Sequence, residues 1–297
     1  MKNASIYGLM ILGCLVPSLA TADTKSQYYN VDVARTYNTT NSTDTVVASC
    51  THAADIIVGG GCYNSDSMTT VSSYPLLGTS TVPGSYTCSV SATNGTVFVA
   101  RALCKTPGTD SKSNYYQTSY QASAVKSLPS SLGTGVYGAT AYCSGNDPVV
   151  SGGAYSQNGW FPTIGGIESI VSQYPQPNGN GNVDFWHASV RFNNNTGNAQ
   201  DTLTTFAICK TSGNKSAYEI GPNSTTWSSY PGSPKRLSAN CSSASSIILS
   251  GGCWGTGIYN GNASYPQGSG VGNTDFFQCN IFPNSSGQLG VYAFCLK

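Results

Sequence analysis

Short apolar runs alternate with polar, turn-rich stretches along the whole chain, and the apolar positions do not follow the 3.6-residue period of helices. Three aliphatic runs are followed, directly or after one serine, by a pair of glycines: Ile56–Val58, Val149–Val150 and Ile247–Leu249. Aliphatic and β-branched residues in such short runs predict buried strands that stop or bulge at the glycines.

Three further apolar runs end at a cysteine: Val97–Cys104, Leu203–Cys209 and Leu289–Cys295. They predict closing strands of three similar units. Shorter alternating stretches, such as Thr69–Tyr74 and Tyr86–Ala92, lie between turns rich in Gly, Asn, Pro and Ser. We therefore predict an all-β protein with four to five antiparallel strands in each unit.

The units share an ordered set of landmarks: a cysteine, Gly-Gly, Tyr-Pro and a closing cysteine. The landmarks of the first copy return 191 residues later, so that Cys50 corresponds to Cys241. An altered copy lies between them. Because the Tyr-rich connectors also resemble one another, we assign residues 23–108 to repeat unit 1, 109–213 to unit 2 and 214–297 to unit 3.

A small unit with one apolar face gains stability by packing that face on its siblings. We therefore predict a single disulfide-stapled body with pseudo-threefold symmetry, similar to a β-prism. The alternative is three small tandem β domains.

The first 22 residues have the features of a signal peptide. Lys2 precedes a short apolar run, Ile6–Leu19, and Ala20-Thr21-Ala22 fits the small-residue cleavage rule. We expect a mature start at Asp23 and a secreted, extracellular protein, periplasmic in transit. No later apolar run is long enough for a membrane span.

Removal of Cys14 with this segment turns eleven cysteines into ten, an even number that predicts five disulfides in a secreted chain. In unit 2, alanines at 154 and 188 replace both inner cysteines, and joint loss marks a bonded pair because loss of one partner would leave a free thiol. The predicted disulfides are Cys62–Cys88, Cys253–Cys279, Cys50–Cys104, Cys143–Cys209 and Cys241–Cys295.

Composition excludes several functions. The formal net charge is +1 and 8% of residues are charged, so no basic cluster is present to bind nucleic acid. No Cys-x-x-Cys occurs, and the two histidines, His52 and His187, do not have metal-ligand spacing. We expect no metal and no cofactor.

Aromatic residues recur at fixed places in all three units. One follows each Gly-Gly-Cys or Gly-Gly-Ala, and one is the tyrosine of each Tyr-Pro. A third lies two residues before the second inner cysteine or its alanine replacement. Shared core packing explains such recurrence. The alternative is a set of equivalent surface platforms, and the residues after Gly-Gly are the best candidates for ligand binding: Tyr63, Tyr155 and Trp254.

Unit 2 contains additional candidates. It has an insertion that carries Trp160, and the adjacent pair Trp186-His187 beside Asp184. These three residues, Trp160, Trp186 and His187, are candidate ligand contacts. Glu168 in this unit is a candidate carboxylate for a hydrolase, with Asp184 as its nearest plausible partner, and no motif constrains the pairing.

The Cys…Gly-Gly…Tyr-Pro…Cys unit resembles repeats of secreted bacterial proteins of unassigned activity. The threefold stapled β pattern is similar to β-prism proteins by architecture alone, and many of those bind carbohydrate. Our leading hypothesis is a secreted binding protein, lectin-like or adhesive, with a carbohydrate or cell-surface ligand. The alternatives are an extracellular structural or coat protein, and a secreted hydrolase with its site in unit 2.

Overall fold

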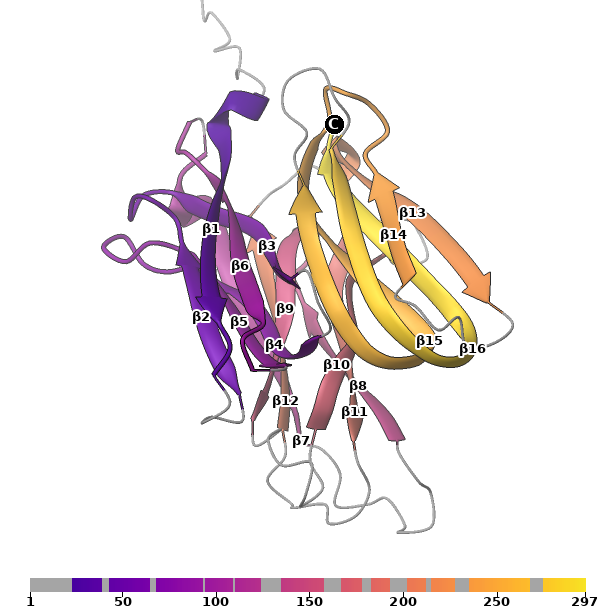
Figure 1. The fold of residues 1–297 in the computed structure, drawn as a ribbon. Coiled ribbons are helices and arrows are strands. Elements are labelled where there is room, and N and C mark those ends of the chain that lie inside the picture. The colour runs from indigo at the N-terminus through magenta and orange to yellow at the C-terminus, as the bar shows by residue number, and fades with distance from the viewer. Residues whose placement is uncertain are drawn as a thin grey trace, which may run out of the picture.

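A computed structural model describes residues 23–38, 43–64, 68–92, 94–108, 110–123, 135–157, 167–177, 183–192, 202–211, 215–227, 235–267 and 275–297. The predicted signal peptide and Trp160 lie outside the described residues. Strands and three single-turn 3₁₀ helices make up the regular structure of these ranges (Figure 1). Among the described residues, no helix is long and apolar enough to cross a membrane.

Unit 1 contains two three-stranded halves that pack face to face. The first has the strand order β1-β6-β3 and the second has the order β2-β5-β4, all antiparallel. The strands of unit 1 are β1 (Tyr28–Thr36), β2 (Asp44–Ser49), β3 (Ile56–Asn64), β4 (Met68–Leu76), β5 (Ser85–Ala92) and β6 (Val97–Lys105).

Unit 2 repeats this arrangement with the halves β7-β12-β9 and β8-β11-β10. Its strands are β7 (Tyr115–Ser123), β8 (Gly135–Tyr142), β9 (Val149–Gln157), β10 (Ile167–Pro177), β11 (Val183–Phe192) and β12 (Thr202–Lys210). The strands of unit 3 are β13 (Tyr218–Trp227), β14 (Lys235–Asn240), β15 (Ile247–Gln267) and β16 (Phe276–Leu296). Strands β15 and β16 have 21 residues each, and together they occupy the places of four strands in the other units.

Units 1 and 2 therefore have six strands each, more than the four to five predicted. The first strand of each unit lies at a sheet edge and contains many Tyr, Asn, Ser and Thr residues, so it lacks the apolar alternation of a buried strand. A 3₁₀ turn precedes each of these edge strands: η1 (Lys25–Gln27), η2 (Lys112–Asn114) and η3 (Lys215–Ala217).

Sheets cross the boundaries between units. Strand β4 pairs with β9, β10 pairs with the first part of β15, and the last part of β15 pairs with β3. Because β15 and β16 continue from one sheet into another, three six-stranded sheets result. We name them sheet I (β1-β6-β3-β15-β16-β14), sheet II (β2-β5-β4-β9-β12-β7) and sheet III (β8-β11-β10-β15-β16-β13).

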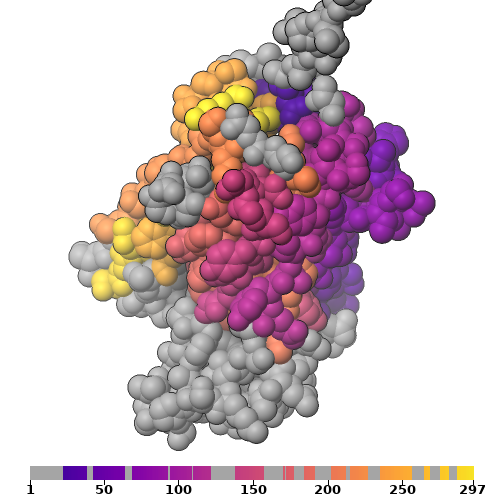
Figure 2. Space-filling model, turned by 180° about the vertical axis from the view of Figure 1, so that it is seen from behind, coloured from indigo at the N-terminus to yellow at the C-terminus, as the bar shows by residue number. Residues whose placement is uncertain are grey.

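Each sheet combines half of one unit with half of the next, and the cycle closes from unit 3 to unit 1. The single pseudo-threefold, β-prism-like body is thus confirmed, because the described parts of the three units share their sheets and do not form separate tandem domains. Seen from behind, the middle of the chain lies between the first unit on one side and the last on the other (Figure 2).

All five predicted disulfides are present, and they staple the interior. The loops closed by the inner and outer pairs of units 1 and 3 have separations of 26 and 54 residues. In the chain-entropy account, each closed loop destabilises the unfolded state by about 3 to 4.5 kcal/mol. In unit 2 the replacing residues, Ala154 and Ala188, are fully buried in a separate apolar cluster with Ile170, Val190 and Leu203.

Lysines of the 3₁₀ turns link each unit to the preceding one. Lys25 of unit 1 forms an ion pair with Asp275 of unit 3 at 2.9 Å, and Lys215 of unit 3 forms one with Asp184 of unit 2. Lys112 of unit 2 instead donates to carbonyl oxygens of unit 1, the nearest being Ala53 at 2.6 Å. The three links run in one cyclic direction.

A buried charged cluster lies where the turns of units 1 and 2 meet. The Nζ of Lys105, which has no solvent exposure, donates to Asp23 at 2.8 Å and to Asp110 at 2.7 Å. Lys210 shares Asp110 at 2.7 Å. Burial and the same carboxylates raise the pKa of Tyr28, which donates to Asp23 at 3.1 Å. The buried lysine is therefore hydrogen-bonded to acids from two units, as a buried charge requires.

Candidate ligand-binding surface

The glycine pairs position the aromatic residues of the inner core. A Cβ atom on Gly60, Gly152 or Gly251 would lie 2.2 to 2.3 Å from the ring of an aromatic residue of the same unit. Each of these glycines therefore leaves room for one ring. The three rings are Tyr86, Trp186 and Phe277, and all are 2% exposed.

The next glycine in each unit permits contact with the neighbouring unit. A Cβ atom on Gly252 would lie 2.0 Å from the carbonyl oxygen of Gln173 and 2.3 Å from the Cα atom of Tyr174. Gly61 and Gly153 have the same relation to Ser264-Tyr265 and Ser73-Tyr74. The Gly-Gly and Tyr-Pro landmarks of the sequence thus meet at the junctions between units.

On the outer side of each junction, the ring of the tyrosine before proline passes over this glycine to the strand beyond it. On that strand it contacts the side chain of the residue that pairs with the glycine. The aromatic residue that follows Gly-Gly-Cys or Gly-Gly-Ala lies on the same face. We call these three half-buried groups seams: seam I (Tyr63, Tyr265, Arg101), seam II (Tyr155, Tyr74, Phe206) and seam III (Trp254, Tyr174, Tyr292).

Seam I is held by an ion pair. The rings of Tyr63 and Tyr265 have centroids 4.5 Å apart, and the guanidinium carbon of Arg101 lies 5.0 and 5.4 Å from them. Arg101 donates to Asp32 at 2.6 and 2.7 Å and to the carbonyl oxygen of Pro266 at 3.1 Å. Burial acts to raise the pKa of Asp32, but the hydrogen bonds from Arg101 and Tyr63 outweigh it and lower that pKa.

Seam II consists of aromatic rings. Tyr74 stacks on Phe206 with centroids 5.0 Å apart and meets the edge of Tyr155 at 5.7 Å. Such offset and edge contacts are favourable for aromatic pairs.

Seam III combines aromatic rings with a histidine. Tyr174 stacks on Tyr292 at 5.4 Å, and His187 lies 5.6 Å from Tyr174 on its other side. A Cβ atom on Gly290 would lie 2.0 Å from the Nε1 atom of Trp254, so the indole lies over that glycine. His187 shares a 3.0 Å hydrogen bond with Thr140, and burial lowers the pKa of the imidazole. It is therefore neutral at pH 7.

The structure separates the predicted ligand contacts into two groups. Tyr63, Tyr155 and Trp254 all lie in seams, and His187 adjoins seam III. Trp186 faces the opposite way, because neighbouring strand residues point to opposite faces of a sheet, and it is buried in the core. At 2% exposure, Trp186 does not form part of the outer surface that the seams share.

Sequence comparison of the units did not predict the third member of each seam. Arg101, Phe206 and Tyr292 occupy the same register position on β6, β12 and β16, opposite the second glycine. Their chemistry differs, so no shared residue type marks the position. The common distance to the closing cysteine is the signal that could have found them.

The carboxylates considered for hydrolysis do not form a described pair. Asp184 is hydrogen-bonded to Lys215, and the side chain of Glu168 lies outside the described residues. These observations give no support to a hydrolase site in unit 2.

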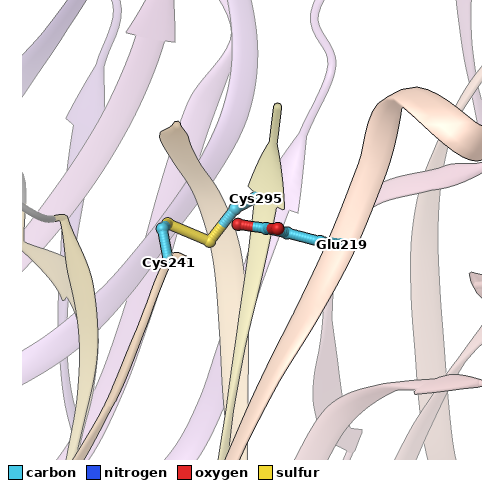
Figure 3. Close-up of side chains that lie close together, drawn as sticks. All are labelled: Glu219, Cys241 and Cys295. Carbon is cyan, nitrogen blue, oxygen red and sulfur yellow. A yellow bond between two sulfur atoms is a disulfide. The ribbon is translucent and has the colours of Figure 1, made fainter. Parts of the chain in front are cut away.

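One group of potential metal ligands, Glu219, Cys241 and Cys295, has ligand atoms within 4.8 Å of one another (Figure 3). The two sulfurs form a disulfide and therefore offer no thiolate. The carboxylate of Glu219 accepts hydrogen bonds from the backbone N–H and the hydroxyl of Ser242. The carboxylate of Glu219 therefore joins β13 to the turn at Ser242 through hydrogen bonds, beside a disulfide that has no thiolate for a metal.

The chain matches no protein-family model, and no curated protein sequence matches it significantly.

Proposed function

We propose that this chain is a secreted carbohydrate-binding protein, lectin-like or adhesive, that contacts its ligand through the three seams. One observation carries the proposal. At every junction, half-exposed aromatic side chains from two different units lie on one outer sheet face: Tyr63 contacts Tyr265, Tyr155 contacts Tyr74, and Tyr174 stacks on Tyr292 on the face that also carries Trp254.

The chemistry of the seams suits sugar rings. Flat aromatic faces cover the apolar C–H face of a sugar, and tyrosine hydroxyls beside them can hydrogen-bond to its hydroxyl groups. Three seams on three sheets allow one molecule to engage several copies of a surface glycan. Weak individual sites then give a much higher overall affinity. Five disulfides are compatible with an oxidising, extracellular location.

A glycan array with the purified protein tests the proposal. We expect binding to a related set of glycans, with a signal that falls at least tenfold in the triple variant Tyr63→Ala, Tyr155→Ala, Trp254→Ala. The control variant is Tyr120→Ala, because Tyr120 is 54% exposed on β7 and belongs to no seam. Its signal should equal that of the unmodified protein.

An extracellular structural or coat protein is the second candidate. The cyclic lysine links and the stapled interior favour it, since they build a durable body without any ligand. Silence across a broad glycan array, together with retained folding, would support this candidate and remove the first.

A further inference from the structure

The outer face of sheet III carries more aromatic side chains than its seam alone. Tyr142 of β8 is 63% exposed, and its ring lies 5.2 Å from that of Phe185 on β11. The positions that correspond to Tyr142 in the other units hold Ser49 and Asn240. This edge pair is therefore a feature of unit 2.

The edge pair continues into seam III. Phe185 and His187 are two residues apart on β11 and so face the same side of the sheet. His187 contacts Tyr174 of β10, which stacks across β15 onto Tyr292 of β16. Trp254 of β15 lies beside them over Gly290. We call these six residues the sheet III track: Tyr142, Phe185, His187, Tyr174, Tyr292 and Trp254.

The track extends over five neighbouring strands, in the order β8, β11, β10, β15 and β16. Neighbouring strands are 4.7 to 4.9 Å apart, so the track is roughly 19 Å long. A single sugar ring covers one aromatic pair. A surface of this length fits several consecutive rings of an extended chain.

The charge of the track points to the same kind of ligand. Its six side chains carry no formal charge at neutral pH, because His187 is the only titratable member near pH 7 and burial favours its neutral form. The hydroxyls of three tyrosines and Thr140 offer hydrogen bonds along the track. Seam I, by contrast, contains charged groups, because Arg101 forms an ion pair with Asp32.

We propose that the sheet III track binds an extended, uncharged glycan chain that lies across the strands. This inference rests on the proposed carbohydrate-binding function and adds the ligand class and the place. Tyr142 and Phe185 form the far end of the site, and they contact only chains long enough to extend beyond seam III.

Isothermal titration with a size series of neutral oligosaccharides, from the glycan class identified on the array, tests this. For the unmodified protein, affinity should rise with chain length and then level off. In Tyr142→Ala, the longest members should bind about tenfold more weakly, while the shortest bind unchanged. Tyr120→Ala, which removes another exposed tyrosine, from sheet II, should match the unmodified protein at every length.

The outcomes separate the two proposals. If Tyr142→Ala leaves the length dependence unchanged while Tyr174→Ala or Trp254→Ala weakens binding, the extended track is wrong and the seam proposal stands. If acidic glycans bind better than neutral ones, the ligand class is wrong. If no oligosaccharide binds at any length, both proposals fail.

Discussion

Tyr174 stacks on Tyr292 with ring centroids 5.4 Å apart, although the two residues belong to strands that are not neighbours. Strand β15 lies between them and contributes Gly252 at the crossing point. The absence of a side chain at that one position lets the ring of unit 2 reach unit 3. Seam geometry and the joining of units therefore depend on the same glycine.

We expect Gly252→Ala to lower the free energy of unfolding by about 3 kcal/mol, because the new Cβ atom meets the backbone of Gln173 and Tyr174 on the neighbouring strand. Urea unfolding measures the change. Gly95→Ala is the comparison, since a Cβ atom there meets nothing within 4 Å and only its φ of 86° opposes alanine. That backbone cost is roughly 1 to 2 kcal/mol. If Gly252→Ala were as stable as the unmodified protein, the close approach of Gln173 and Tyr174 to Gly252 would be wrong.

Removing the inner disulfide of unit 3 should reproduce the natural state of unit 2. The double variant Cys253→Ala, Cys279→Ala should fold with its other four disulfides but lose about 3.5 kcal/mol of stability, the chain-entropy value for a loop of this length. Thermal unfolding measures the loss of stability, and mass mapping of the oxidised protein identifies the four remaining disulfides. A single Cys279→Ala variant should be less stable and form mispaired disulfides, because it leaves a free thiol that can exchange with other disulfides.

The reverse change should add a staple to unit 2. Ala154 and Ala188 occupy the places of the inner cysteines and are fully buried. We expect Ala154→Cys, Ala188→Cys to form a sixth disulfide and to raise the thermal midpoint in the absence of reductant. Thiol titration of the unfolded protein decides: two reactive thiols would show that the backbone of unit 2 has moved away from bonding distance.

Asp110 should make the protein sensitive to acid. Burial alone would raise the pKa of this carboxyl, but Lys105 and Lys210 outweigh burial and lower it. A carboxyl whose pKa is lower in the folded state contributes stability above its unfolded pKa of about 3.9 and loses it as the pH falls through the folded value. Thermal midpoints should therefore fall steeply below about pH 4.

Asp110→Asn should lose part of this pH dependence and about 3 kcal/mol at pH 7, because it leaves buried Lys105 with Asp23 as its remaining acid. Asp32→Asn changes a carboxylate that is 37% exposed and should cost less. A variant as stable as the unmodified protein at pH 7, with the same acid midpoint, would show that the cluster does not hold the turns together.

The link between Lys25 and Asp275 should couple the two ends of the cycle. Asp275 has a side-chain exposure of 5% and also accepts a hydrogen bond from the backbone of Ile248. Lys25→Met should destabilise by about 2 kcal/mol, since a buried carboxylate loses its cation. A double-mutant cycle with Asp275→Asn should give a coupling energy above about 1 kcal/mol. An additive result would mean that the pair contributes no energy to ring closure.

The disulfides were predictable because unit 2 changed both members of a pair together, which reveals a contact without any structure. The strands before the glycines were predictable from their aliphatic runs. The edge strands were not, because a strand such as Tyr28–Thr36, with one partner and much solvent exposure, needs no apolar alternation. In the same way, Arg101, Phe206 and Tyr292 share a position but no chemistry, so only the register places them beside the other seam residues.

Trp186 shows the limit of motif comparison at the site. The sequence places it beside His187 in the unit that lost its inner disulfide and carries the Trp160 insertion, which makes both residues candidate ligand contacts. Strand alternation sends the indole into the core and the imidazole to the surface. The choice of face depends on which side of β11 is covered, and that depends on sheet pairing with another unit.

The pairing of β3 with the last part of β15 sets the order of assembly. Cys62 in unit 1 lies opposite Ser264 in unit 3, so the side of β3 that faces unit 3 has no partner until the chain has been made almost to its end. Units 1 and 2 can join as soon as β9 exists, but the incomplete body presents an unpaired strand edge, a site at which chains aggregate. Truncation before residue 264 leaves that edge open, and the long strand β15 is then the element whose arrival closes it.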